Sequence, residues 1–191
     1  MRETDTMGGA EIAAAWTRLE AAVRQPTGVF PARWCASADT DVPVAATAAC
    51  DLRDLFPLCV AWRRRSLQVA RELVLSAVAV QHPDGSFPSK VDESGHALDP
   101  MPTCPLFASA ANIAAGEFPP PDYVAAVLPA VELHVEWAWR RLNGGSGSPR
   151  WPSAREAWLP EAWDPTVRSV EAIAVLRAEL EACLALAERC D

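Results

Sequence analysis

Apolar residues recur at helical spacing along most of this chain, and this periodicity constrains its fold more than any other feature. In the first such segment, Ile12, Trp16, Leu19 and Val23 fall on one face of a helix over residues 10–24. Proline near the start of a segment indicates where later helices begin, because a first-turn proline removes no helical hydrogen bond. Further helices are expected over residues 54–65, 67–81, 103–115 and 120–142 and from 165 to beyond 183. The sequence contains no convincing strand, so we predict a single all-α domain over residues 1–191.

The last helix is expected to begin at Asp164-Pro165, an aspartate cap followed by a first-turn proline. Its expected buried stripe follows the large apolar residues Val167, Val170, Ile173, Leu176, Leu180 and Cys183.

Three long loops separate the expected helices, over residues 25–41, 82–101 and 143–164. Loops beyond about 12–15 residues in a compact domain are usually functional or disordered. Tryptophan side chains in the first and third loops favour a functional interpretation, so the candidate binding residues are sought there.

Composition excludes several classes of partner. The formal net charge is −8, and there is no basic stripe beyond Arg63-Arg64-Arg65, so nucleic acid is not an expected partner. The strongest apolar run, residues 73–80, is far shorter than the ~20 residues that cross a bilayer, so no membrane partner is expected. The six cysteines form no Cys-x-x-Cys pair or zinc-ligand spacing, and no signal peptide is recognisable. We therefore expect a cytoplasmic protein with no metal and no cofactor.

Several segments resemble, in order and spacing, the (α/α)-toroid glycoside hydrolases of the trehalase and processing α-glucosidase clan. An aspartate, Asp54, opens one helix, and the turn Gln81-His-Pro-Asp-Gly85 follows the returning helix. Thr103-Cys-Pro-Leu-Phe and Ser148-Pro-Arg-Trp151 are similar to later parts of the same pattern. The resemblance extends over about residues 30–185. It implies helical hairpins forming part of an (α/α) toroid, and a carbohydrate-active protein binding a small-molecule or oligosaccharide substrate.

If the chain is catalytic, the resemblance implies an inverting glycosidase acting on α-linked glucosides. Two departures keep an alternative open. The stretch Asn143-Gly-Gly-Ser-Gly lacks the clan's acidic residue, and Val170-Glu-Ala-Ile replaces the clan's Val-Asp-Leu-Asn. The alternative is a non-catalytic helical module, derived from a toroid and retained for binding or assembly. A terpene-cyclase-like toroid protein is a third interpretation, because Gln81, Gly85 and Phe87 resemble the repeat of that family, although no aspartate-rich run accompanies them.

The candidate substrate-binding residues begin with Asp54, whose carboxylate is expected at the mouth of the helical ring. An N-cap role explains the same residue. Trp34, Trp151 and Trp163 offer indole faces that match the apolar face of a sugar ring, and they are equally suited to anchor their loops against the core.

The remaining candidates are carboxylates in loops. Asp84 is a ligand-facing candidate within an Asp-Gly turn. Glu156 and Glu161 are the candidate catalytic residues, because burial beside Trp158 would raise a carboxyl pKa, while a solvated acidic loop is the structural alternative. A homo-oligomer is a further expected partner, since a second copy can complete a ring that one short chain leaves open.

Overall fold

The fold combines helices with small antiparallel sheets. The computed structural model describes residues 9–37, 48–103, 106–143, 149–153 and 170–190. In these ranges the α-helices are α1 (Gly9–Ala22), α2 (Leu55–Arg63), α3 (Leu67–Val78), α4 (Phe107–Ala115), α5 (Pro121–Asn143) and α6 (Val170–Ala187). The strands are β1 (Val23–Arg24), β2 (Trp34–Cys35), β3 (Ala49–Asp51), β4 (Phe87–Asp92) and β5 (Ala97–Thr103), and η1 (Leu52–Asp54) is a short 3-10 helix. The expected all-α fold, with hairpins of an (α/α) toroid, is therefore wrong.

The main correction lies in the segment expected to be a polar loop, residues 82–101. Most of it forms the hairpin β4–β5, and β4 also pairs with β3, so β4 is the central strand of a three-stranded antiparallel sheet. Pro88 lies opposite Pro102, so two residues without an N–H share one position of the ladder. The Asp92 carboxylate closes the hairpin turn by accepting hydrogen bonds from the Ser94 and His96 N–H groups. Prolines and turn residues are typical of loops, so they concealed this strand pair in the sequence.

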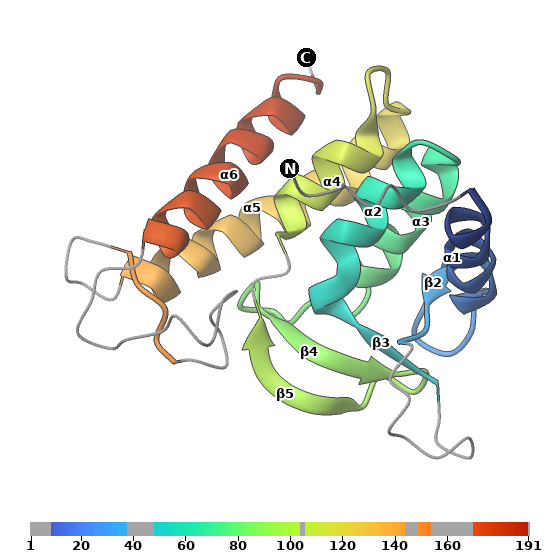
Figure 1. Cartoon of the computed structure of the whole chain (residues 1–191). Helices are drawn as coiled ribbons and strands as arrows, with labels where there is room; N and C mark the ends of the chain where they lie inside the picture. Colours follow the sequence, from blue (N-terminus) through green and yellow to red (C-terminus); the bar gives the residue numbers. More distant parts are fainter. Residues whose placement is uncertain (1–8, 38–47, 104–105, 144–148, 154–169, 191) are drawn as a thin grey trace, which may run out of the picture.

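The helices α2, α3, α4, α5 and α6 form a layer on one side of this sheet (Figure 1). Helix α4 is central to the layer, since it contacts α2, α3, α5 and α6. Alanine occupies most of its buried positions, which lets these four helices approach closely: Ala108, Ala110, Ala111, Ala114 and Ala115. Helix α1 stands at the edge of the molecule, beside β2 (Figure 1), and none of its residues is fully buried.

The expected starts of the helices α2 and α3 are confirmed. Helix α2 begins directly after Asp54 and carries Pro57 in its first turn. The Ser66 hydroxyl caps α3 by accepting a hydrogen bond from the Val69 N–H. Both are local effects that a short stretch of sequence contains in full.

The expected buried face of the last helix is right at Leu176, which is buried, and at Cys183, which packs against the core, but it is wrong at three other positions. Val170 is 80% exposed, and Ile173 and Leu180 are also exposed. Val167 lies outside the described residues. The buried positions of α6 are Ala172, Val175, Leu176, Glu179, Ala182 and Leu186. Small residues on this face let α6 pack closely against α4 and α5.

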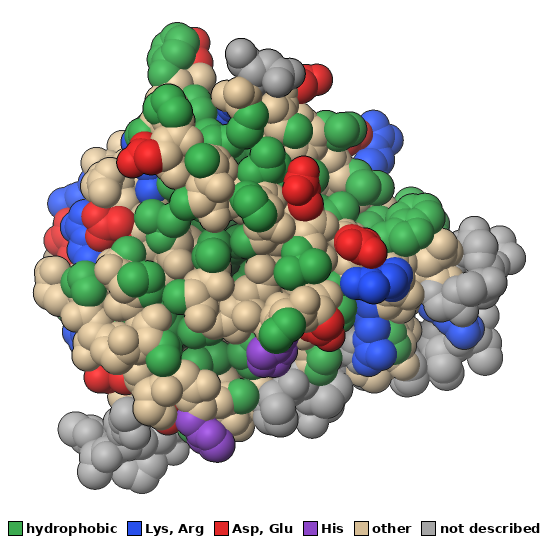
Figure 2. All heavy atoms as spheres, turned by 180° about the vertical axis from the view of Figure 1, so that it is seen from behind, with side chains coloured by type: hydrophobic (Ala, Val, Ile, Leu, Met, Phe, Trp, Pro, Cys, Tyr) green, Lys and Arg blue, Asp and Glu red, His purple; other side chains and the backbone are tan. Residues whose placement is uncertain are grey.

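The surface mixes residue types. Figure 2 shows hydrophobic side chains scattered among acidic, basic and neutral ones on the face behind that of Figure 1. Exposed large apolar side chains of the molecule include Phe118, Trp139 and Leu184. In the described part of the chain, every helix is too short or too polar to cross a membrane.

Candidate functional site

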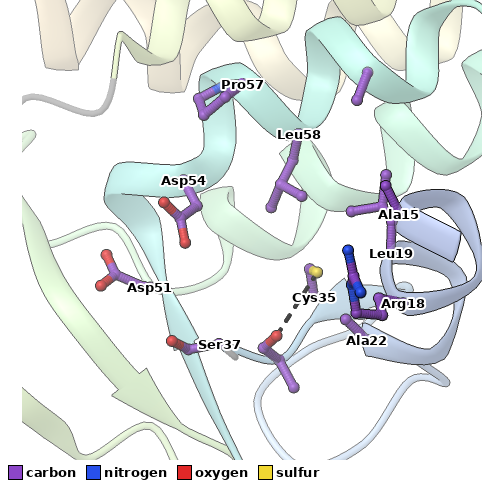
Figure 3. Close-up of a pocket in the computed structure, with 12 residues that line it drawn as sticks. Ala15, Arg18, Leu19, Ala22, Cys35, Ser37, Asp51, Asp54, Pro57 and Leu58 are labelled. Carbon is purple, nitrogen blue, oxygen red and sulfur yellow. Dashed lines mark hydrogen bonds between the residues drawn. The ribbon is translucent and has the colours of Figure 1, made fainter. Parts of the chain in front are cut away.

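A pocket of about 440 Å³ opens between α1 and the segment from β3 to α2 (Figure 3). This volume lies within the range of small-molecule sites. Residues from five elements and the chain after β2 line it: Ala15, Arg18, Leu19, Ala22, Cys35, Ala36, Ser37, Asp51, Asp54, Pro57, Leu58 and Ala61. Its walls are therefore largely apolar, and its charges come from one arginine and two aspartates.

Backbone hydrogen bonds assemble the floor of the pocket. The N–H of Ala36 donates to the carbonyl of Ala22 at the end of α1 (2.9 Å). The N–H of Ser37 donates to the carbonyl of Ala49 in β3 (2.7 Å). The chain after β2 is thus tied to α1 on one side and to β3 on the other, which places Cys35 and Ser37 beside the aspartates.

Asp51 performs the capping role at this helix start. Its carboxylate accepts hydrogen bonds from the Arg53 N–H (3.0 Å) and from the Arg53 guanidinium (3.0 and 2.7 Å). Asp51 therefore caps η1, and its charge is balanced by Arg53.

The side chain of Asp54, unlike that of Asp51, does not cap a helix. Asp54 is the N-cap residue of α2 by position, but its side chain makes no capping hydrogen bond. Its backbone is already helical (φ −83°, ψ −7°), because η1 leads directly into α2. Within the described ranges, its carboxylate has no hydrogen-bond or ion-pair partner. The N-cap explanation of Asp54 is therefore not what the structure shows.

The surroundings of Asp54 favour its protonated form. Partial burial by the pocket walls raises the pKa of this carboxyl group above its ordinary value, and the nearby Asp51 charge raises it further, while Arg53 acts in the opposite direction. Burial likewise raises the pKa of the Cys35 thiol to about 11, with Asp54 adding to the shift. At neutral pH Cys35 is therefore a neutral thiol, which makes it a poor nucleophile.

The expected indole platforms are covered by protein. Trp34 is 1% exposed, and its ring stacks on Phe30 with the centroids 4.7 Å apart, so no indole face is open to a sugar. Trp151 is also buried, in a cluster with Trp137 and Leu142. Both tryptophans pack in the core, as expected if they anchor their loops rather than stack on a sugar. Trp163 lies outside the described residues.

The other candidates do not lie at this pocket. Asp84 is exposed in the turn before β4, where its carboxylate accepts hydrogen bonds from the N–H and hydroxyl of Ser86 (2.9 and 2.7 Å). These hydrogen bonds lower the pKa of Asp84, as expected for a turn-forming carboxylate. Glu156 and Glu161 lie outside the described residues.

Sequence reasoning missed Arg18, Ser37 and Asp51. Arg18 lies on the polar side of the first apolar stripe, where an arginine looks like an ordinary solvated residue. The spacing Asp51-x-x-Asp54 is a sequence feature that points to two carboxylates within one helical turn. No group of three or more side chains able to hold a metal ion occurs in the described ranges.

No protein-family model, curated protein or solved structure matches this chain.

Proposed function

We propose that this protein binds a small carbohydrate in the pocket between α1 and α2. The observation that carries the proposal is the Asp54 carboxylate, which faces an apolar-walled pocket without a partner in the described chain. A carboxylate that is not used in capping is available to accept hydrogen bonds from ligand hydroxyl groups.

Two further features support a sugar as the ligand. Partial removal of water strengthens hydrogen bonds between the Asp54 carboxyl group and ligand hydroxyl groups. Leu19, Pro57 and Leu58 provide apolar surface for the carbon face of a ring. In sequence alone, the segment around Asp54 resembles a helix start that carries a sugar-binding aspartate in glycosidases of the trehalase clan, and this is the reason for choosing a carbohydrate among hydroxyl-bearing ligands.

The test is titration calorimetry with a panel of neutral mono- and disaccharides, glucose and trehalose among them. We expect at least one to bind, and Asp54→Asn to weaken that binding at least tenfold, because the amide replaces one acceptor oxygen and removes the charge. Asp84→Asn is the matched control, since it removes an exposed aspartate outside the pocket, and it should bind as the wild type does. A panel without any binder, or equal binding by Asp54→Asn and wild type, would show the proposal to be wrong.

Hydrolysis of an α-glucoside is a second candidate, favoured by the unequal environments of the two aspartates. Asp54 has a raised pKa and suits a proton donor, whereas Asp51 accepts two hydrogen bonds from the Arg53 guanidinium. In an inverting reaction, Asp54 gives its proton to the glycosidic oxygen, and Asp51 takes a proton from the water that attacks the anomeric carbon. The assay is release of nitrophenol from nitrophenyl α-glucoside. Activity that survives in both Asp54→Asn and Asp51→Asn would exclude this pair.

We also propose a cellular compartment for the protein, based on its cysteines. The described cysteines, Cys35, Cys50, Cys59, Cys183 and Cys190, carry free thiols. Free thiols are expected in a reducing compartment, so we place the carbohydrate-binding protein in the cytoplasm.

A further inference from the structure

The pocket holds two opposite charges that do not pair with each other. Arg18 projects from α1 on the side of the pocket opposite Asp51 and Asp54 (Figure 3). In the described part of the chain, neither Arg18 nor Asp54 has an ion-pair partner. Other arginines of the molecule are engaged, for example Arg33 with Glu72 and Arg65 with Glu20.

We propose that the natural ligand is an acidic carbohydrate, whose carboxylate or phosphate group binds Arg18 while its hydroxyl groups bind Asp54. This inference rests on the proposed function and adds the charge of the ligand to it. The guanidinium presents parallel N–H donors that match the oxygen atoms of a carboxylate or a phosphate.

The charge balance of the pocket supports an anionic group at this position. Arg53 offsets Asp51 through its two guanidinium hydrogen bonds, so Arg18 and Asp54 are the charges left for a ligand. A ligand with an acidic group at one end and hydroxyl groups at the other matches both ends of the pocket.

The rest of the molecule disfavours anions. The net charge of −8 repels them at long range, and salt screens this repulsion beyond about 8 Å at physiological ionic strength. A preference for an acidic sugar over its neutral counterpart therefore has to come from a local cation, and Arg18 is the cation that lines the pocket.

The experiment compares glucose, glucuronate, glucose 6-phosphate and inorganic phosphate by titration calorimetry in wild type, Arg18→Gln, Arg18→Lys and Asp54→Asn. We expect at least one of the two acidic sugars to bind wild type at least tenfold more tightly than glucose. Arg18→Gln should reduce that affinity to the level of glucose, and Arg18→Lys should restore part of it. Arg64→Gln is the matched control, because it removes the same charge from an exposed position outside the pocket, and it should leave the preference unchanged. Arg18 is itself exposed on a helix without a fully buried residue, so its variants should fold.

The outcomes separate this inference from the proposed function. Equal binding of neutral and acidic sugars in wild type, or a preference that survives in Arg18→Gln, would overturn the inference and leave carbohydrate binding intact. Inorganic phosphate binding as tightly as glucose 6-phosphate would also overturn it, since the site would then recognise an anion alone. Acidic-sugar binding that depends on Arg18 but not on Asp54 would overturn the proposed role of Asp54 and support Arg18. Binding of no sugar would overturn both.

Discussion

Glu179 on α6 is completely buried, and its carboxylate is used to cap another helix. It accepts hydrogen bonds from the Ala108 and Ser109 N–H groups at the start of α4 (2.8 and 2.9 Å). The residue that precedes α4, Leu106, has a left-handed backbone (φ 52°) and no polar side chain, so it cannot cap the helix itself. A carboxylate from a distant element replaces the missing cap and lies at the positive end of the α4 dipole.

Replacing Glu179 should therefore destabilise the fold in a graded way. Glu179→Ala leaves the Ala108 and Ser109 N–H donors unsatisfied and should lower the free energy of unfolding by about 3–5 kcal/mol. Glu179→Gln keeps one acceptor oxygen and should cost about 1 kcal/mol less than alanine. Glu181→Gln, on the exposed face of the same helix, should change stability by less than about 0.5 kcal/mol. Urea denaturation measures all three, and equal stability of the alanine and glutamine variants would contradict the capping role.

His134 makes stability depend on pH. Complete burial lowers its pKa from 6.5 to about 4, while a hydrogen-bond contact between its Nδ1 and the Gly85 carbonyl (3.0 Å) acts in the opposite direction. As the pH falls below 6.5, the unfolded chain takes up a proton before the folded protein does. The stability associated with neutral His134 is therefore lost towards pH 4, by at most about 1.4 kcal/mol per pH unit.

Glu179, whose Oε2 lies 3.8 Å from His134 Nε2, contributes with the opposite sign. Burial raises its pKa above the unfolded value, so the folded protein takes up that proton first and gains stability as the pH falls. The contribution of His134 is therefore measured by comparing variants. The free energy of unfolding is determined by urea denaturation at pH 7, 6 and 5 for wild type, His134→Gln and His96→Gln. We expect His134→Gln to lose less stability than wild type on acidification, and the exposed His96 variant to follow wild type. An unchanged pH dependence in His134→Gln would contradict this assignment.

At the scale of elements, the turn before β4 depends on one glycine. Gly85 has φ +92°, and a Cβ atom there would lie 2.2 Å from the Leu133 carbonyl oxygen of α5. Gly85→Ala should therefore lower the free energy of unfolding by more than about 3 kcal/mol, from backbone strain and from displacement of α5. Gly9→Ala, where nothing lies within 4 Å, should change stability by less than about 1 kcal/mol. Urea denaturation of the two variants tests the contact, and similar stabilities would show that the turn and α5 are not packed together.

Elements fixed by local chemistry were predictable from sequence, and those fixed by distant partners were not. Pro57 and Ser66 mark helix starts because their effects act within one turn. The hairpin β4–β5 was missed because pairing with β3 and packing under the helices outweigh its proline-rich composition. The face of α6 was misassigned in part because only large apolar residues were expected inside, whereas Glu179, which binds the α4 amides, and two alanines are buried as well.

The candidate site follows the same rule. Asp54 was identified because an aspartate at a helix start is visible in sequence. The sequence did not show that the Asp54 side chain makes no capping hydrogen bond. This depends on η1 leading directly into α2 and on Asp51 acting as the cap of η1. Arg18 was missed because only the packing of α1 beside β2 and β3 gives it a pocket to line.

At the scale of the whole molecule, the pocket is closed by its least anchored helix. Helix α1 contacts α2 through Trp16, which packs edge to face on Trp62 with the centroids 5.7 Å apart. The Arg65 guanidinium lies over the Trp16 ring and pairs with Glu20. Exposed ion pairs contribute little, so apolar packing of Trp16, Leu19 and Ala22 anchors this wall of the pocket, and Trp16 is the largest of these side chains.

We therefore expect α1 to open without global unfolding. In hydrogen exchange followed by mass spectrometry, its amides should be less protected than those of α4 and α5, because local opening requires loss of few buried contacts. Trp16→Ala should reduce the protection of α1 further and weaken binding of the sugar identified by titration, although Trp16 does not line the pocket. The reason is that the apparent affinity falls with the fraction of molecules in which α1 is docked. Trp139→Ala, which removes an exposed tryptophan from α5, should change neither quantity. Protection of α1 equal to that of α4 would mean that the pocket wall is rigid, and the affinity of Trp16→Ala should then equal that of wild type.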